Sequence, residues 1–198
     1  MVNQTDLRVI RSRKMIKAAF LELIEEKGYE YITVKDIAEK AFINRKTFYF
    51  HFENKTALFN EIIRDALDLM LANTQYKKIT AENISFPIDL GIDIRHVFHN
   101  ISENQRLFSI LFSDTSNYEV SVQTKSLLQS MIVNNLIDGA PKSLLIPKDL
   151  LSESITSLIW VVFTWWNNQN TYSEEEAIQI LSRLLTTGLL DSIGLDTV

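Results

Sequence analysis

Side chains that can donate hydrogen bonds are concentrated in one short segment of this 198-residue chain. They are Asn44, Arg45, Lys46, Thr47, Tyr49 and His51. Arginine and lysine can pair with the O6 and N7 atoms of guanine in the major groove of DNA, and asparagine can pair with adenine. The segment therefore predicts a surface that contacts nucleic acid.

Other kinds of chemistry find little support in the sequence. The chain has no cysteine, which excludes disulfides, thiol nucleophiles and zinc-thiolate sites. It has no glycine-rich phosphate loop, nucleophile elbow or carboxylate cluster. His96 and His99 are spaced to share a metal ion on a helix, but no third ligand of the right type lies nearby in the sequence. We therefore expect no enzyme activity, catalytic residue, metal site or cofactor.

Charge is distributed unevenly along the chain. The net charge is −5, which by itself argues against a nucleic-acid partner. Residues 1–55 carry 11 Lys and Arg against 8 Asp and Glu, however, whereas residues 56–198 carry 9 against 17. This asymmetry favours DNA contact by the N-terminal part alone.

The elements that position the donor segment are predicted to be short helices. Thr33 can cap a helix over 34–40, with Asp36 completing a capping box, and Asn44 can cap a second helix over 45–51. Two short helices joined by a three-residue turn, 42–44, form a helix-turn-helix, whose second helix enters the major groove.

The rest of the chain also shows helical periodicity, with few glycines and prolines. Phe48 and Phe52 are expected to face inward from the second short helix. We predict an all-α protein, with a three-helix DNA-binding domain over 1–55 and a C-terminal helical bundle over 56–198. The other helices are expected at about 7–27, from Asn54 to past Leu71, 88–102, 105–112, 118–137 and 148–168. Ser173 is expected to cap a last helix, whose apolar stripe reaches Leu189.

Aromatic residues of the C-terminal part have two interpretations. They can line an effector cavity, because pockets between bundled helices are largely apolar, or they can fill a solid core. The candidate pocket residues are Phe98, Phe108, Phe112, Trp160, Phe163 and Trp165.

The last two helices are candidates for an interface between two copies of the chain. The segment 158–166 is apolar almost all round, and the final helix has a wide apolar stripe. Burial within one chain is the alternative. Since 158–166 is too short to span a membrane and the N-terminus is polar, we expect a cytoplasmic homodimer without membrane contact.

The segment 33–58, TVKDIAEKAFINRKTFYFHFENKTAL, resembles the signature of the tetracycline-repressor family. The resemblance implies that Thr33, Tyr49 and Lys55 contact phosphates. It also implies that Asn44, Arg45, Lys46 and Thr47 lie at or near bases. His51 either joins this surface or packs at the end of the second helix. The form NRKTFY is similar to a branch that includes regulators of dihydroxyacetone kinase genes.

Three positions depart from the family pattern. Phe42 replaces the usual turn glycine, Asn44 the usual serine, and Lys46 a frequent glycine. A bulky residue in this turn is expected to keep a negative φ.

The sequence thus predicts a ligand-responsive repressor that binds a palindromic double-stranded DNA operator as a homodimer and responds to an unidentified small-molecule effector. The alternative is a co-regulator of the same fold that acts mainly through protein-protein contacts.

Overall fold

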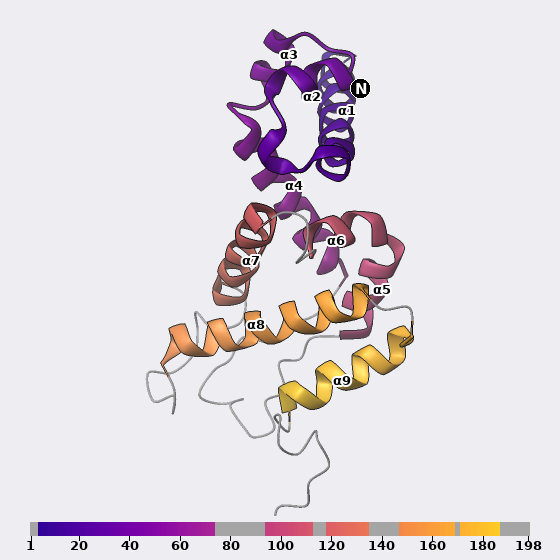
Figure 1. Cartoon of the computed structure of the whole chain (residues 1–198), viewed down its shortest axis with the longest axis vertical. Helices are drawn as coiled ribbons and strands as arrows, with labels where there is room; N and C mark the ends of the chain where they lie inside the picture. The colour runs from indigo at the N-terminus through magenta and orange to yellow at the C-terminus, as the bar shows by residue number, and fades with distance from the viewer. Residues whose placement is uncertain (1–3, 74–93, 113–117, 135–146, 169–170, 187–198) are drawn as a thin grey trace, which may run out of the picture.

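The computed structural model describes residues 4–73, 94–112, 118–134, 147–168 and 171–186, and every regular element in these ranges is helical (Figure 1). The elements are α1 (Gln4–Lys27), the 3-10 turn η1 (Tyr29–Tyr31), α2 (Val34–Lys40), α3 (Arg45–His51), α4 (Lys55–Met70), α5 (Ile94–Glu103), α6 (Gln105–Leu111), α7 (Tyr118–Ile132), α8 (Lys148–Asn167) and α9 (Glu174–Thr186). The predicted all-α fold class is confirmed. Residues 88–93, 135–137 and 187–189 of the predicted helices lie outside the described residues.

The predicted caps position the short helices. Thr33 Oγ1 accepts a hydrogen bond from the Asp36 backbone N–H at 3.2 Å, and the Asp36 carboxylate accepts one from the Thr33 N–H at 2.7 Å. Asn44 and Asn54 accept bonds from the backbone N–H groups of Thr47 and Ala57. Each helix therefore begins where its side-chain cap satisfies backbone donors that would otherwise be unpaired.

Helices α1, α2 and α3 lie together at one end of the molecule, and α4 leads from this end towards the remaining helices (Figure 1). The rings of Phe20, Tyr29 and Phe59 form a buried cluster, with centroid separations of 5.1 to 6.0 Å. Phe59 belongs to α4, so the core of the end formed by α1, α2 and α3 extends past residue 55.

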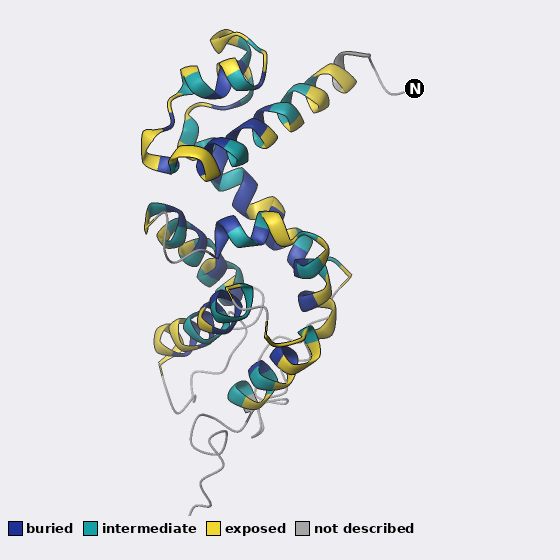
Figure 2. Ribbon diagram, turned by 45° about the vertical axis from the view of Figure 1, so that its right-hand side comes forward, coloured by how far each residue is buried: buried dark blue, intermediate teal, exposed yellow. Residues whose placement is uncertain are grey.

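Helices α5 to α9 form the other end of the molecule. Figure 2 shows that their inward faces are buried and their outer faces exposed. Phe98 and Phe163 pack at 5.0 Å between ring centroids, joining α5 to α8. No helix among the described residues is long and apolar enough to cross a membrane.

Candidate nucleic-acid interface and neighbouring pocket

The inner face of α3 is fixed by two buried rings. Phe48 and Phe52 are 0% and 4% exposed, and their ring centroids lie 5.9 Å apart. The guanidinium of Arg13 in α1 lies 4.7 Å from the Phe52 ring centroid, a favourable cation–π position. The predicted inward orientation of both phenylalanines is confirmed, and it gives α3 a fixed rotation on the body of the protein.

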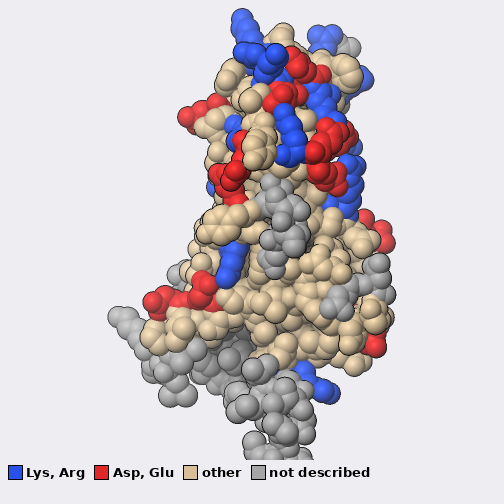
Figure 3. All heavy atoms as spheres, viewed as in Figure 1, with Lys and Arg blue, Asp and Glu red and all other residues tan. Residues whose placement is uncertain are grey.

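The outer face of α3 presents free cationic side chains. Arg45, Lys46 and Tyr49 are exposed. Within the described part of the chain, Arg45 and Lys46 make no ion pair, whereas Arg13, Lys17 and Lys40 are all bound by carboxylates. Figure 3 shows Lys and Arg gathered at the end of the molecule formed by α1 to α3. Unpaired, exposed cations at this end are available to an anionic partner.

Asn44 and Thr47 combine capping with a position at the start of α3. The Asn44 Oδ1 atom accepts hydrogen bonds from the Thr47 backbone N–H at 2.7 Å and from its hydroxyl at 3.1 Å. The Asn44 side chain also has an amide NH₂ group, and this group makes no hydrogen bond to the described residues. Asn44 can therefore cap α3 and donate outward at the same time.

The turn before α3 corrects one expectation. Phe42 has a φ of 54°, so the expected negative φ is wrong. The N–H groups of Phe42 and Ile43 donate to the Glu39 and Ala38 carbonyls at 3.1 and 2.9 Å, which is the Schellman ending of a helix. This ending requires a left-handed residue directly after the C-cap residue, here Ala41. Phe42 occupies that position although the residue is 91% exposed.

Two of the residues that the resemblance assigns to phosphates also have internal partners. The Thr33 hydroxyl takes part in the capping box of α2. The Lys55 ammonium donates to the Tyr29 and Glu30 carbonyls at 2.8 and 3.3 Å and lies 4.4 Å from the Tyr29 ring centroid. Because an ammonium has three donors, Lys55 keeps one for a further acceptor.

His51 is held against α1. Its Nε2 atom lies 2.6 Å from the Ser12 hydroxyl, and its backbone carbonyl accepts a bond from Arg13 at 3.3 Å. Burial, followed by the positive charge of Arg13, lowers the pKa of His51, so the neutral imidazole is favoured. These contacts favour the packing interpretation of His51.

One exposed residue of α3 was absent from the predicted surface. Phe50 is 74% exposed and follows Lys46 by four residues, so the two lie one turn apart on the same face. Two features of the sequence could have indicated this. Phe50 lies four residues after Lys46, and it does not share the helix face of Phe48 and Phe52.

Ion pairs connect α1 to α4 below this surface. Glu61 of α4 pairs with both Arg13 and Lys17 of α1, and Lys17 also reaches Asp65 at 2.5 Å. Burial acts to raise the pKa of Glu61, but the hydrogen bonds from Lys17 and Arg13 outweigh it, and the pKa is lowered. The ionised pairs fix α1 against α4.

The predicted pocket aromatics lie mainly in the core. Phe98, Phe108, Phe112, Trp160 and Phe163 are buried, and neighbouring rings among them pack with centroids 5.0 to 6.2 Å apart. Trp165 is half-buried and packs on Tyr172 with centroids 4.8 Å apart.

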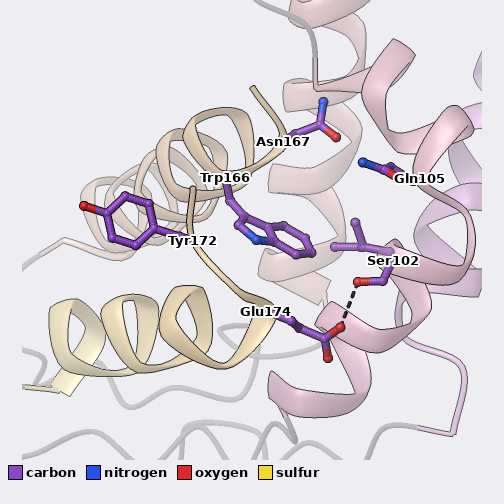
Figure 4. Close-up of a pocket in the computed structure, with 7 residues that line it drawn as sticks. Ser102, Gln105, Trp166, Asn167, Tyr172 and Glu174 are labelled. Carbon is purple, nitrogen blue, oxygen red and sulfur yellow. Dashed lines mark hydrogen bonds between the residues drawn. The ribbon is translucent and has the colours of Figure 1, made fainter. Parts of the chain in front are cut away.

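A pocket of about 320 Å³ lies beside this cluster (Figure 4). Its lining residues come from α5, α6, the end of α8, the start of α9 and, with Tyr172, the connection between α8 and α9. They are Ile101, Ser102, Gln105, Trp166, Asn167, Tyr172 and Glu174. The hollow therefore opens next to Trp166.

Comparison with known proteins agrees with this architecture. The family model described as bacterial regulatory proteins, tetR family, matches residues 16–62, and a transcriptional regulator C-terminal region model matches residues 93–187. A TetR transcriptional regulator from Streptococcus agalactiae superposes with a TM-score of 0.62 at 22% identity, covering 93% of this chain and 97% of that one.

The curated relatives include a named activator and a named repressor. The dhaKLM operon transcriptional activator DhaS of Lactococcus lactis is 29% identical over 62% of this chain, and the match spans 62% of DhaS, less than two thirds of its length. The transcriptional repressor KstR2 of Mycolicibacterium smegmatis is 24% identical over 87% of each chain. The chain is thus similar to DNA-binding transcriptional regulators, and it belongs to the tetR family of bacterial regulatory proteins.

Proposed function

We propose that the protein is a ligand-responsive repressor that binds a palindromic operator as a homodimer and reads it with α3. The observation that carries the proposal is the outer face of α3. Arg45 and Lys46 are exposed there without an ion pair to the described residues, on a helix that Phe48 anchors from below. A short, anchored helix with donors at its N-terminal end suits the major groove.

The donors divide into two roles. Asn44, Arg45, Lys46 and Thr47 face base edges, whereas Thr33, Tyr49 and Lys55 hold phosphates and set the position of α3. Base contacts carry sequence specificity, and phosphate contacts carry position. Lys55 is suited to positioning because two backbone carbonyls already fix its ammonium.

Dimerisation is assigned to α8 and α9. On α8, Leu150 and Val161 are 53% and 60% exposed, and on α9 Leu184 and Leu185 are half-buried. Packing of two copies of the chain through these faces, about a two-fold axis, covers the apolar side chains. It also places two copies of α3 on one DNA duplex. In this assignment residues 1–55 bind DNA, and residues 56–198 bind the effector and the partner.

Regulation follows from differential binding. An effector that prefers the conformation unable to fit the operator lowers the affinity for DNA by that difference in binding free energy. The pocket beside Trp166 is available for such a molecule.

Selection of bound sequences from a random pool of duplex DNA tests the proposal. We expect an enriched palindrome. Arg45→Ala should lose affinity at particular base pairs, by about 1–3 kcal/mol, while Lys55→Ala should weaken all sequences alike and reduce the salt slope by about one. Lys125→Ala, which removes a lysine paired with Glu153 on the distant α7 and α8, is the control and should change neither.

Equal, sequence-independent losses in Arg45→Ala and Lys55→Ala would contradict the assigned roles. Absence of any enriched sequence would instead support a co-regulator that acts through protein-protein contacts, for which the acidic balance of residues 56–198 is the supporting observation.

A further inference from the structure

The pocket beside Trp166 combines a carboxylate, a fixed aromatic ring and neutral polar groups. Glu174 supplies the carboxylate, Gln105 and Asn167 supply amides, and Ser102 supplies a hydroxyl (Figure 4). Its volume of about 320 Å³ is in the range of small-molecule sites. Polar groups from four helices thus line one pocket beside the apolar core.

The charge of the lining is negative. Glu174 is its acidic residue, and no lysine or arginine is among the lining residues. The carboxylate of Glu174 accepts a hydrogen bond from the Ser102 hydroxyl at 2.8 Å, which holds it at the pocket. The neighbouring acids are committed elsewhere, because Glu175 pairs with Arg95 and Glu176 accepts the Ser173 N–H at 2.8 Å.

The indole of Trp166 is held in place by the core. It packs against Phe98 with ring centroids 4.9 Å apart and an interplanar angle of 59°, and it also lines the pocket. A fixed indole attracts a cation placed over its face, and more strongly where water is partly excluded.

We propose that this pocket binds a small organic molecule with a protonated primary amine. The ammonium lies between the face of Trp166 and the carboxylate of Glu174. The amide oxygens of Gln105 and Asn167 accept its remaining N–H donors, which favours a primary amine over a quaternary ammonium. The regulatory part of this proposal rests on the proposed function, because an amine can change the affinity for DNA only of a protein that binds DNA.

A short route leads from the pocket to the DNA-facing end. Gln105 lines the pocket, and the next residue, Arg106, reaches α1. Its guanidinium donates to both carboxylate oxygens of Glu25, from Nε at 3.3 and 3.2 Å and from Nη2 at 2.6 Å. This bidentate pair joins α6 to α1 at the surface of the molecule. A shift of Gln105 on binding an amine therefore moves Arg106 and is passed to α1, the helix that supports α3.

Calorimetry with the intact protein tests the ligand class. The probes are benzylamine and the primary alkylamines from propylamine to hexylamine, each compared with the alcohol of the same skeleton and with benzyltrimethylammonium. We expect at least one amine to bind at least about tenfold more tightly than its alcohol, and benzylamine to exceed its trimethylated form. If no amine binds more tightly than its alcohol, the proposal is wrong.

Matched variants locate the binding. Glu174→Gln removes the charge and keeps an acceptor for Ser102, so it should weaken amine binding at least about tenfold. Glu175→Gln removes an adjacent charge outside the pocket lining and should leave amine binding unchanged. Circular dichroism and thermal unfolding establish that both variants fold. Unaltered amine affinity in a folded Glu174→Gln variant would overturn the assignment.

Titration of the selected DNA with and without the amine separates this inference from the proposed function. We expect the amine to change DNA affinity in the wild type but not in Glu25→Gln, which still binds the amine. Failure of the amine-free protein to bind any DNA counts against the proposed function alone. Amine binding without any change in DNA affinity would overturn the route through Arg106.

Discussion

Phe42 has a left-handed backbone conformation, which favours glycine, and the residue is 91% exposed. A left-handed conformation costs a residue with a Cβ about 1–2 kcal/mol, and an exposed ring returns little of this by burial within the chain. Packing inside the protein therefore does not account for phenylalanine at this position. A contact with another molecule, such as DNA, would account for it.

Phe42→Gly is expected to stabilise the protein. The substitution relieves the left-handed strain, and after the entropic cost of glycine the gain should be up to about 1 kcal/mol. Urea unfolding measures it. Phe42→Ala keeps the Cβ atom and should gain less, so equal stability of the two variants would contradict the strain.

Phe50 adds an apolar group to a surface otherwise defined by donors. We expect its ring to contact the methyl group of a thymine, a contact that apolar side chains make in the major groove. Replacing that thymine by deoxyuridine in the selected operator removes only the methyl group. The wild type should then lose about fourfold in affinity, since burying a methyl group is worth about 0.8 kcal/mol.

The matching variant is Phe50→Ala, which should bind the operator more weakly and should not distinguish thymine from deoxyuridine. A wild-type protein that binds every singly substituted operator equally well would show that Phe50 reads no methyl group.

At the scale of the helices, local signals were predictable and contacts between distant segments were not. Thr33, Asn44 and Ser173 were identified as caps because capping depends on neighbouring residues, and each makes its capping hydrogen bond. The φ of Phe42 was predicted with the wrong sign, because the Schellman ending of α2 decides it. The two carbonyls bound by Lys55 belong to η1, more than twenty residues earlier, and no periodicity indicates such a contact.

Hydroxyl groups in α7 and α8 allow a matched test of helix packing. Thr124 of α7 is fully buried, and its hydroxyl has no hydrogen-bond partner among the described residues. Thr156 of α8 is equally buried, but its hydroxyl donates to the Ser152 carbonyl at 2.7 Å. A buried hydroxyl without a hydrogen-bond partner lowers the free energy of unfolding, whereas a hydrogen-bonded one raises it.

Thr124→Val should therefore raise the free energy of unfolding by about 1 kcal/mol, and Thr156→Val should lower it by about 1 kcal/mol. Denaturant unfolding of the two variants gives both values. Destabilisation of similar size in both would show that the Thr124 hydroxyl is paired in solution.

At the scale of the whole molecule, the proposed function depends on two copies of α3 held at a fixed separation. Val161→Glu places a charge on the exposed apolar face of α8, and a two-fold interface there would bring two such charges together. We expect the variant to be monomeric by light scattering and to lose affinity for the full palindrome. Ser130→Glu, at an exposed position of α7, should remain dimeric. A dimeric Val161→Glu variant would place the interface elsewhere.

The sharing of α4 between the two ends of the molecule limits how the protein can be recombined with its relatives. A chain cut after Lys55 would lose Phe59, whose ring packs on both Phe20 and Tyr29. The end formed by α1, α2 and α3 would then expose part of its own core. A hybrid regulator that takes its DNA-binding specificity from this protein should therefore be joined after α4. The transferred segment then keeps Phe59, whose ring completes the core around Phe20 and Tyr29.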